Sequence, residues 1–179
     1  EIERIYDHFA PPPWENPDAT SPLFEARKFE DREFAQWVRT NVTPHKQAGY
    51  AIVNLSLKPE GGVPGDLTAD QMDAVADLAE AHSFDEIRVA HEQNLVFAHI
   101  KKSELYELWL ELHKLGLATP NINLIGDIIA CPGLDYCGLA NARSIPIAQR
   151  ITKRFADLER QYDLGELRLK ISGCINACG

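Results

Sequence analysis

The alternation of apolar and polar residues is clearest between residues 47 and 118. Residues 49–57 place four aliphatic side chains on one face and more polar ones on the other, which predicts a strand. After a loop rich in glycine and proline, Thr68 and Gln71 have the spacing of a capping box, so a helix is expected to begin there. The apolar face of this helix is predicted to contain Met72, Val75, Ala76 and Ala79.

Two further strands and a second helix follow in the same region. Residues 87–90 and 95–100 predict strands joined by a short turn. Ser103 is expected to cap a helix that Gly116 ends, and the order β-α-β-β-α predicts a ferredoxin-like module without its last strand. Residues 122–125, or another half of the protein, are expected to supply that strand. The apolar stripe of the second helix is Leu105, Leu108, Trp109, Leu112 and Leu115.

The first 46 residues carry a cluster of prolines, which steers the backbone away from helix. We therefore expect an irregular arm or linker there. Apolar residues around Asp31 predict one short amphipathic helix within it, and Trp14 is expected to anchor the arm on a neighbouring surface. The prolines are Pro11, Pro12, Pro13, Pro17 and Pro22.

The last third of the chain predicts a smaller α/β unit. A buried strand is expected over residues 125–130, a helix over 147–162 and a second strand over 167–171. The fold class is therefore α+β. Its expected units are an arm at 1–46, a ferredoxin-like module at 47–118, and the truncated start of an α/β domain at 119–179.

Composition excludes several classes of function. The apolar share of 45% is ordinary for a globular chain, and no apolar run approaches the length of a membrane span. The net charge of −9 disfavours a nucleic-acid partner, because phosphate binding needs clustered Lys and Arg. Four cysteines reserved for one site suit a reducing compartment, so we expect a cytoplasmic protein with neither membrane nor nucleic-acid partners.

The four cysteines form two pairs near the end of the chain. Cys131 and Cys137 stand in CPGLDYC, and Cys174 and Cys178 stand in GCINACG. Thiolates select zinc, copper(I) or iron–sulfur, and these spacings fit the short zinc motifs poorly. The 36 residues between the pairs are enough for a helix and a strand that return the chain to the same place. We expect the four sulfur atoms to meet there and hold a metal centre.

This pairing of Cys-x5-Cys with Cys-x3-Cys resembles the sirohaem-dependent sulfite and nitrite reductases. Pro132, the run from Gly138 to Ala140, and Asn176 in the second cysteine loop match that family as well. Ile175 and Ala177 replace the proline and glycine that usually stand in this loop.

The resemblance implies that all four cysteines hold one [4Fe–4S] cluster and that Cys178 also bridges it to the sirohaem iron. It further implies six-electron reduction of a small anionic substrate, with a flavoprotein or ferredoxin as electron donor. The expected activity is that of an assimilatory sulfite reductase haemoprotein, with nitrite reduction to ammonia as the alternative. Further cofactor contacts that the resemblance suggests are Asn176, Arg143, Arg88, Gln93 and Asn94.

The chain begins without methionine at Glu1 and ends one residue after Cys178. We interpret it as a fragment from the second half of a longer polypeptide, whose missing first half would supply most catalytic Arg and Lys residues. The isolated fragment is then expected to be inactive. Two alternatives stay open, namely an iron–sulfur electron carrier without sirohaem and a structural four-cysteine zinc domain.

Overall fold

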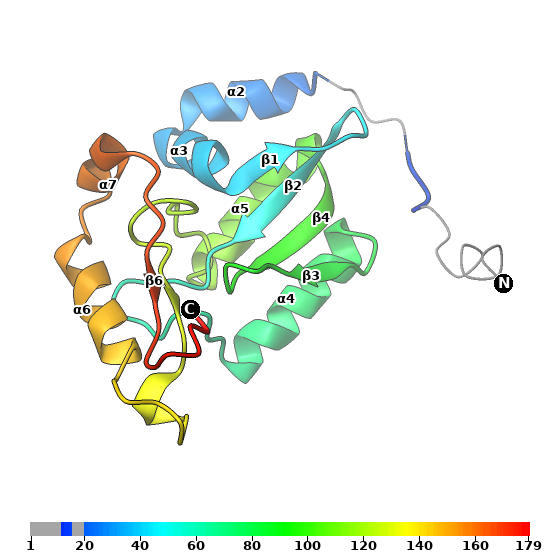
Figure 1. Ribbon diagram of the computed structural model, residues 1–179. Helices are drawn as coiled ribbons and strands as arrows, with labels where there is room; N and C mark the ends of the chain where they lie inside the picture. The colour runs from blue at the N-terminus through cyan, green and yellow to red at the C-terminus, as the bar shows by residue number, and fades with distance from the viewer. Residues whose placement is uncertain (1–11, 16–19) are drawn as a thin grey trace, which may run out of the picture.

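The computed structural model describes residues 12–15 and 20–179, and within them the main unit is a four-stranded antiparallel sheet (Figure 1). Its strands are β1 (Val42–Pro44), β2 (Tyr50–Leu55), β3 (Ile87–Val89) and β4 (Leu95–Lys101). They lie in the order β1-β2-β4-β3. The two strands predicted after the first helix are confirmed, because β3 and β4 form an antiparallel hairpin.

The fourth strand of the sheet comes from before the module. β1 pairs with β2, with Val42 opposite Val53, and so fills the edge position that we expected residues 122–125 or another half to fill. Residues 122–125 contain no strand. They form a turn, in which the amide of Leu124 donates to Asn121 and that of Asp127 donates to Leu124.

Residues 22–44 are regular structure, so the expectation of an irregular arm is wrong for that stretch. Two helices, α2 (Pro22–Glu30) and α3 (Arg32–Asn41), precede β1. Asp31 ends the first and caps the second by accepting a hydrogen bond from the amide of Phe34. Pro22 opens α2 at the first turn, where a helix tolerates proline. Pro11 and Pro17 lie outside the described residues.

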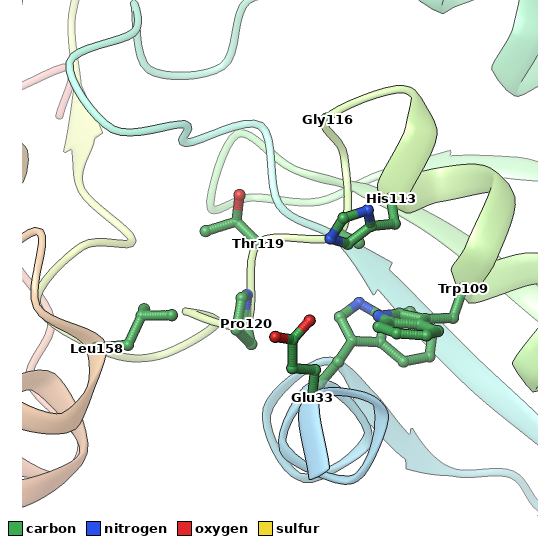
Figure 2. Close-up of a pocket in the computed structure, with 9 residues that line it drawn as sticks. Glu33, Trp109, His113, Gly116, Thr119, Pro120 and Leu158 are labelled. Carbon is green, nitrogen blue, oxygen red and sulfur yellow. The ribbon is translucent and has the colours of Figure 1, made fainter. Parts of the chain in front are cut away.

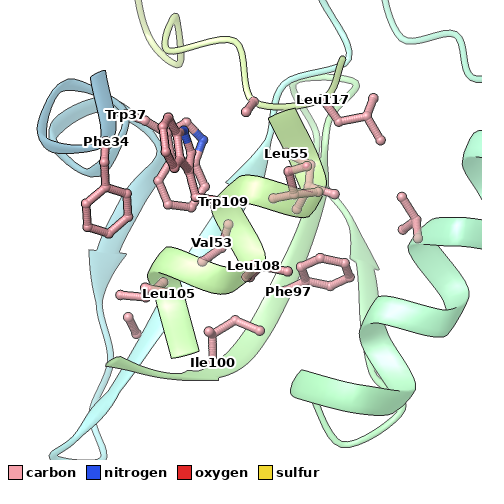
Figure 3. Close-up of a cluster of buried hydrophobic side chains, with 14 of the residues drawn as sticks. Phe34, Trp37, Val53, Leu55, Phe97, Ile100, Leu105, Leu108, Trp109 and Leu117 are labelled. Carbon is pink, nitrogen blue, oxygen red and sulfur yellow. The ribbon is translucent and has the colours of Figure 1, made fainter. Parts of the chain in front are cut away.

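Helices α4 (Ala69–His82) and α5 (Leu105–Lys114) pack with α3 around one core (Figure 3). The capping box of Thr68 and Gln71 is confirmed. Met72, however, is 58% exposed, and Ala76 is exposed too, so only part of the expected α4 face is buried. Ser103 caps nothing, because it lies within a 3-10 turn, η1 (Lys102–Glu104), that precedes α5.

Two tryptophans and a phenylalanine meet on the α3 side of this core. Phe34 and Trp37 of α3 are fully buried and pack near Trp109 of α5 (Figure 3). Fully burying side chains of this size contributes about 1.5–3 kcal/mol each. The segment before the predicted module is therefore part of its core.

The last third forms a second, two-stranded parallel sheet of β5 (Ile129–Ala130) and β6 (Lys170–Ile171). The single helix expected over 147–162 is in fact two, α6 (Ile145–Arg154) and α7 (Leu158–Leu164). Asp157 separates them, because its carboxylate caps α7 by accepting from the amides of Glu159 and Arg160. Within the described ranges, no helix is long and apolar enough to cross a membrane.

Candidate cysteine site

The two cysteine pairs begin at neighbouring strand ends. Cys131 directly follows β5, and Cys174 follows β6 after two residues. The strands run parallel, and the amide of Cys131 donates to the carbonyl of Ile171 at 3.0 Å. The expected adjacency of these strand ends is confirmed.

The Cys131 sulfur is held by polar groups of both loops. It accepts a hydrogen bond from the amide of Gly173 at 3.0 Å and lies 3.1 Å from the Ser144 hydroxyl oxygen. The Ser144 hydroxyl lowers the pKa of the buried Cys131 thiol, burial opposes this, and the amides of Gly173 and Gly133 add to the lowering. The surroundings of this sulfur therefore favour the thiolate, which is the form that binds metals.

Two glycines allow the loops to approach each other closely. A Cβ atom on Gly173 would lie 2.8 Å from the carbonyl oxygen of Ala142, and one on Gly133 would lie 2.6 Å from the Ser144 hydroxyl. Gly133 also has a φ of 59°, which side chains rarely tolerate. A larger residue at Gly173 would push the two cysteine loops apart, and one at Gly133 would clash with residues 142–144, which follow the first loop.

The other three thiols lie nearer the surface. Cys137 and Cys174 are half-buried, and Cys178 is exposed on the last turn of the chain. In residues 12–15 and 20–179, no three His, Cys, Asp or Glu side chains are grouped so that they could hold a metal ion. The structure thus brings the loops together but not the four sulfur atoms, and the four-thiolate ligand set stays a prediction.

Three of the other expected cofactor contacts are exposed. Arg143 is 68% exposed, with its Nε 3.6 Å from a carboxylate oxygen of Asp135, and Asn176 is exposed beside Cys178. Arg88 lies on β3, an edge strand of the four-stranded sheet, and forms an ion pair with Glu86. Arg143 and Asn176 therefore share the cysteine loops, and Arg88 does not.

Gln93 and Asn94 are engaged within the chain. Both atoms of the Gln93 side-chain amide bond to the backbone of Ala130, and Asn94 is buried with bonds to the amide of Leu57 and to Asp127. In this structure the pair therefore joins the ferredoxin-like module to the cysteine unit.

A buried ion pair that the sequence analysis missed lies beside Asn94. Lys58 Nζ is 3.1 Å from Asp127 Oδ1, and both side chains are almost completely buried. The ammonium also donates to the carbonyl of Glu92 and to Asn94, so all three of its protons have acceptors. Burial lowers the pKa of Lys58, and Asp127 opposes that shift. The available signal was a charged residue, Asp127, inside the apolar run predicted as a strand.

A second missed cluster surrounds Trp14 at the other end of the sheet. The Trp14 ring contacts His45, Tyr50, Phe84 and His99, with ring centroids 5.1–5.8 Å apart. The expectation that Trp14 anchors the preceding segment is thereby confirmed. His45 and His99 are hydrogen-bonded to each other at 3.1 Å, and His99 continues to Glu86.

The structure also has a pocket of about 440 Å³ between α3, the end of α5 and the loop before Pro120 (Figure 2). Glu33 and His113 point into it from these two helices, and Leu158 of α7 borders it. None of the residues that line it belongs to the cysteine loops. It therefore has no direct connection to the candidate metal chemistry.

Comparison with known proteins agrees with this architecture. Residues 44–115 match the family model described as the nitrite/sulfite reductase ferredoxin-like half domain. A chloroplastic ferredoxin–nitrite reductase of Arabidopsis thaliana is 30% identical over 84% of this chain and 25% of its own length. A ferredoxin sulfite reductase of Mycolicibacterium paratuberculosis is 34% identical over 59% of this chain and 20% of its own.

Solved structures give the same result. The NirA protein of Mycobacterium tuberculosis superposes with a TM-score of 0.62 and 27% identity, over 78% of this chain and 25% of that one. A dissimilatory sulfite reductase I shares the fold, with a TM-score of 0.53.

The sheet, its flanking helices and the matched residues thus define a ferredoxin-like half domain of the reductase type. The chain belongs to the nitrite and sulfite reductase family. It spans about a quarter of the length of the relatives that it matches.

Proposed function

We propose that this chain is the second-half segment of a sirohaem-dependent reductase that converts sulfite to sulfide or nitrite to ammonia. The observation that carries the proposal is the meeting of two cysteine-bearing loops at the ends of adjacent parallel strands. The ends of such strands are where α/β proteins commonly bind cofactors. The family membership supports the same conclusion.

Cys131, Cys137, Cys174 and Cys178 are the proposed ligands of a [4Fe–4S] cluster, and Cys178 is its proposed bridge to sirohaem. The donor set fits such a group, because four thiolates suit iron–sulfur chemistry and the Cys131 sulfur already accepts an N–H hydrogen bond. When bound, the coupled centre would supply electrons singly to the substrate. The exposed Cys178 lies where a partner group outside the chain can reach it.

The chain's own residues have proposed roles around this centre. The amides of Gly173 and Gly133 stabilise negative charge on the Cys131 sulfur, and the lack of a side chain at Gly173 lets the two loops approach each other closely. Arg143 and Asn176 are exposed on the same loops and are proposed to meet carboxylate groups of the macrocycle. Arg88 remains a proposed contact as well, at the edge of the sheet.

The remaining parts of the reaction belong to the rest of the protein. The missing first half is proposed to provide the cations that bind the anionic substrate. A ferredoxin is the proposed donor, because several relatives are named as ferredoxin-dependent reductases. Sulfite and nitrite reductases match at similar identity, so the choice of oxyanion is decided by experiment. A cytoplasmic location remains part of the proposal.

The test is to purify the full-length protein without oxygen and measure its iron, labile sulfide and absorption spectrum. Five irons per chain are expected, four from the cluster and one from the sirohaem, with four labile sulfides and sirohaem absorption bands. Turnover of sulfite or nitrite by a reduced donor is expected as well. Replacing any of the four cysteines by alanine should abolish the coupled spectrum. Ser56→Ala, at a buried serine of the module, is the matched control and should leave it unchanged.

The same measurement separates the alternatives. A colourless protein with one zinc ion would contradict the proposal in favour of a structural site. A cluster without sirohaem bands would indicate an electron carrier instead.

A further inference from the structure

We propose that the side-chain amide of Gln93 acts as a third strand of the β5–β6 sheet and thereby positions Cys131. Gln93 Nε2 donates to the carbonyl of Ala130 at 2.9 Å, and Gln93 Oε1 accepts from the amide of Ala130 at 3.0 Å. One residue exchanging both backbone bonds with one partner is the pattern of a hydrogen-bonded pair in a sheet. Here a side chain takes the place of the partner strand.

The geometry of β5 explains why this strand needs a second partner. Its other edge is already paired with β6, since the amides of Ile129 and Cys131 donate to the carbonyls of Leu169 and Ile171. Ala130 lies between them and directs its N–H and C=O groups to the opposite side. Ala130 is only 4% exposed, so without Gln93 both groups would be buried and unpaired.

The turn that carries Gln93 is itself held by hydrogen bonds to buried side chains. Gln93 has a φ of 58°, a backbone conformation that persists only where its surroundings enforce it. Next to it, Asn94 is buried and bonds to Asp127, three residues before Ala130. The carbonyl of Glu92 accepts from the buried ammonium of Lys58. The turn at 92–94 therefore grips the segment 127–130 at both ends.

Cys131 is the next residue along this segment. Its sulfur must remain within hydrogen-bond reach of Gly173 and Ser144, which belong to the two cysteine loops. Releasing Ala130 would free β5 to move relative to β6, and the sulfur would move with it. That this displacement affects cluster binding rests on the proposed function. Gln93 is thus a positioning residue, and it acts through Ala130.

The test compares Gln93→Met with Gln161→Met in the 179-residue chain. Methionine has nearly the same length as glutamine but cannot make these hydrogen bonds. Gln161 is the matched control, because its amide also bridges two backbone groups, the N–H of Gly126 and the C=O of Phe155, away from β5. The readout is hydrogen exchange at the amides of Ile129 and Cys131, whose own acceptors are untouched.

We expect these two amides to exchange about 30-fold faster in Gln93→Met than in Gln161→Met, because two lost hydrogen bonds of about 1 kcal/mol each correspond to that factor. Equal exchange rates in the two variants would overturn the proposal. Gln93→Glu serves if the methionine variant does not fold. It keeps the acceptor for Ala130 but loses the donor, and exchange at wild-type rates in that variant would also overturn it.

Measuring bound iron and labile sulfide tests the link to the proposed function separately from the role of Gln93 in the strand. In the full-length protein, Gln93→Met should bind several-fold less iron and labile sulfide than Gln161→Met. A wild-type protein that contains neither iron nor sulfide contradicts the proposed function, whereas the exchange rates still decide the role of Gln93. Normal loading together with faster exchange would show that Gln93 positions the strand but not the ligand, and would overturn the link to the cluster.

Discussion

The Cys131 thiol and the Lys58–Asp127 ion pair are both buried, but their surroundings differ. The Cys131 sulfur is surrounded by hydrogen-bond donors and faces a loop junction, whereas Lys58 and Asp127 neutralise each other inside the protein. A thiol with a lowered pKa is prepared to act as a ligand. A fully satisfied ion pair instead fixes one arrangement of its neighbours.

Cys178→Ser in the full-length protein is expected to remove the coupling between haem and cluster. A serine oxygen is a poor replacement for a soft bridging thiolate, so turnover should fall by about 100-fold. Because Cys178 is exposed, the free energy of unfolding should change by no more than about 0.5 kcal/mol. Absorption spectra and urea titration measure the two effects. An unchanged haem spectrum would show that Cys178 is not the bridge.

Asp127→Asn is expected to destabilise the chain by about 3–5 kcal/mol near neutral pH, because it leaves the Lys58 charge buried and unpaired. The pKa of Lys58 is already lowered by burial and should fall further without Asp127. The unfolded chain then binds the proton more tightly, so stability should rise with pH between about 7 and 9. Urea unfolding of the variant at several pH values in this range measures the change in stability.

Asp73→Asn is the control for that experiment, since Asp73 is an exposed residue of α4. It makes the same change in charge and should alter stability by no more than about 0.5 kcal/mol. Equal losses of unfolding free energy in the two variants would mean that the Lys58–Asp127 pair does not stabilise the fold.

At the scale of elements, short segments are held by side chains from distant parts of the chain. β5 is held by Gln93, and residues 12–15 are held by the rings around Trp14. Beside Trp14, hydrogen bonds join Gln47, His45, His99 and Glu86, and the donor and acceptor at His45 can be assigned. The amide of Gln47 donates to Nδ1 of His45, so the proton of neutral His45 is on Nε2 and points to His99.

Acid is expected to weaken this cluster through His45. Burial lowers the pKa of His45, the backbone hydrogen bond with Gln47 opposes that shift, and the charges of His99 and Arg88 add to the lowering. Because the folded pKa lies below the unfolded value of about 6.5, the stability is complete above that pH and is lost as the pH falls below it. Glu86, the residue before β3, faces the pair, and Glu15, next to Trp14, forms an ion pair with Lys101.

The measurement is the midpoint of urea unfolding at pH 7.5 and at pH 5.5, followed by tryptophan fluorescence. The midpoint should fall less in His45→Gln than in the wild type over this interval. His91→Gln is the control, because His91 is an exposed turn residue, and it should keep the wild-type dependence. If His45→Gln shows the wild-type dependence too, His45 is not the titrating group.

At the scale of the whole molecule, the cysteine loops expose several large apolar residues, including Tyr136 at 80% and Ile175 at 92%. The ferredoxin-like module has a core of its own. Large apolar residues exposed on the loops that carry the proposed ligands are consistent with a surface that another group covers. The remaining members of this set are Leu134 and Leu139.

The isolated 179-residue chain is therefore expected to fold but to contain no sirohaem and no reductase activity. Its module has its own core, whereas the macrocycle would lose one wall and its cationic partners without the first half. Circular dichroism, absorption and a viologen-driven assay test the three statements. Stoichiometric sirohaem with turnover in this segment would contradict the proposal that two halves share the site.

Much of the fold was predictable because its signals are local. The alternation at residues 49–57, the Thr68–Gln71 capping box and the β3–β4 hairpin each depend on residues within a few positions of one another. The prolines led to the wrong expectation of an irregular arm, whereas the short amphipathic helix expected around Asp31 is confirmed by α3, whose Phe34 and Trp37 enter the core. The long helix failed at Asp157, whose capping preference was overlooked.

The sequence by itself determined the helices and strands of the module, the two cysteine pairs and the resemblance to the reductases. Periodicity, capping chemistry and ligand spacing are all properties of neighbouring residues. Only the tertiary structure decided that β1 completes the sheet, that Gln93 pairs with Ala130, and that Lys58 pairs with Asp127. These partners are 37 and 69 residues apart in the two polar pairs, so no local pattern encodes them. They are selected because buried polar groups must find acceptors and donors wherever the packed chain provides them.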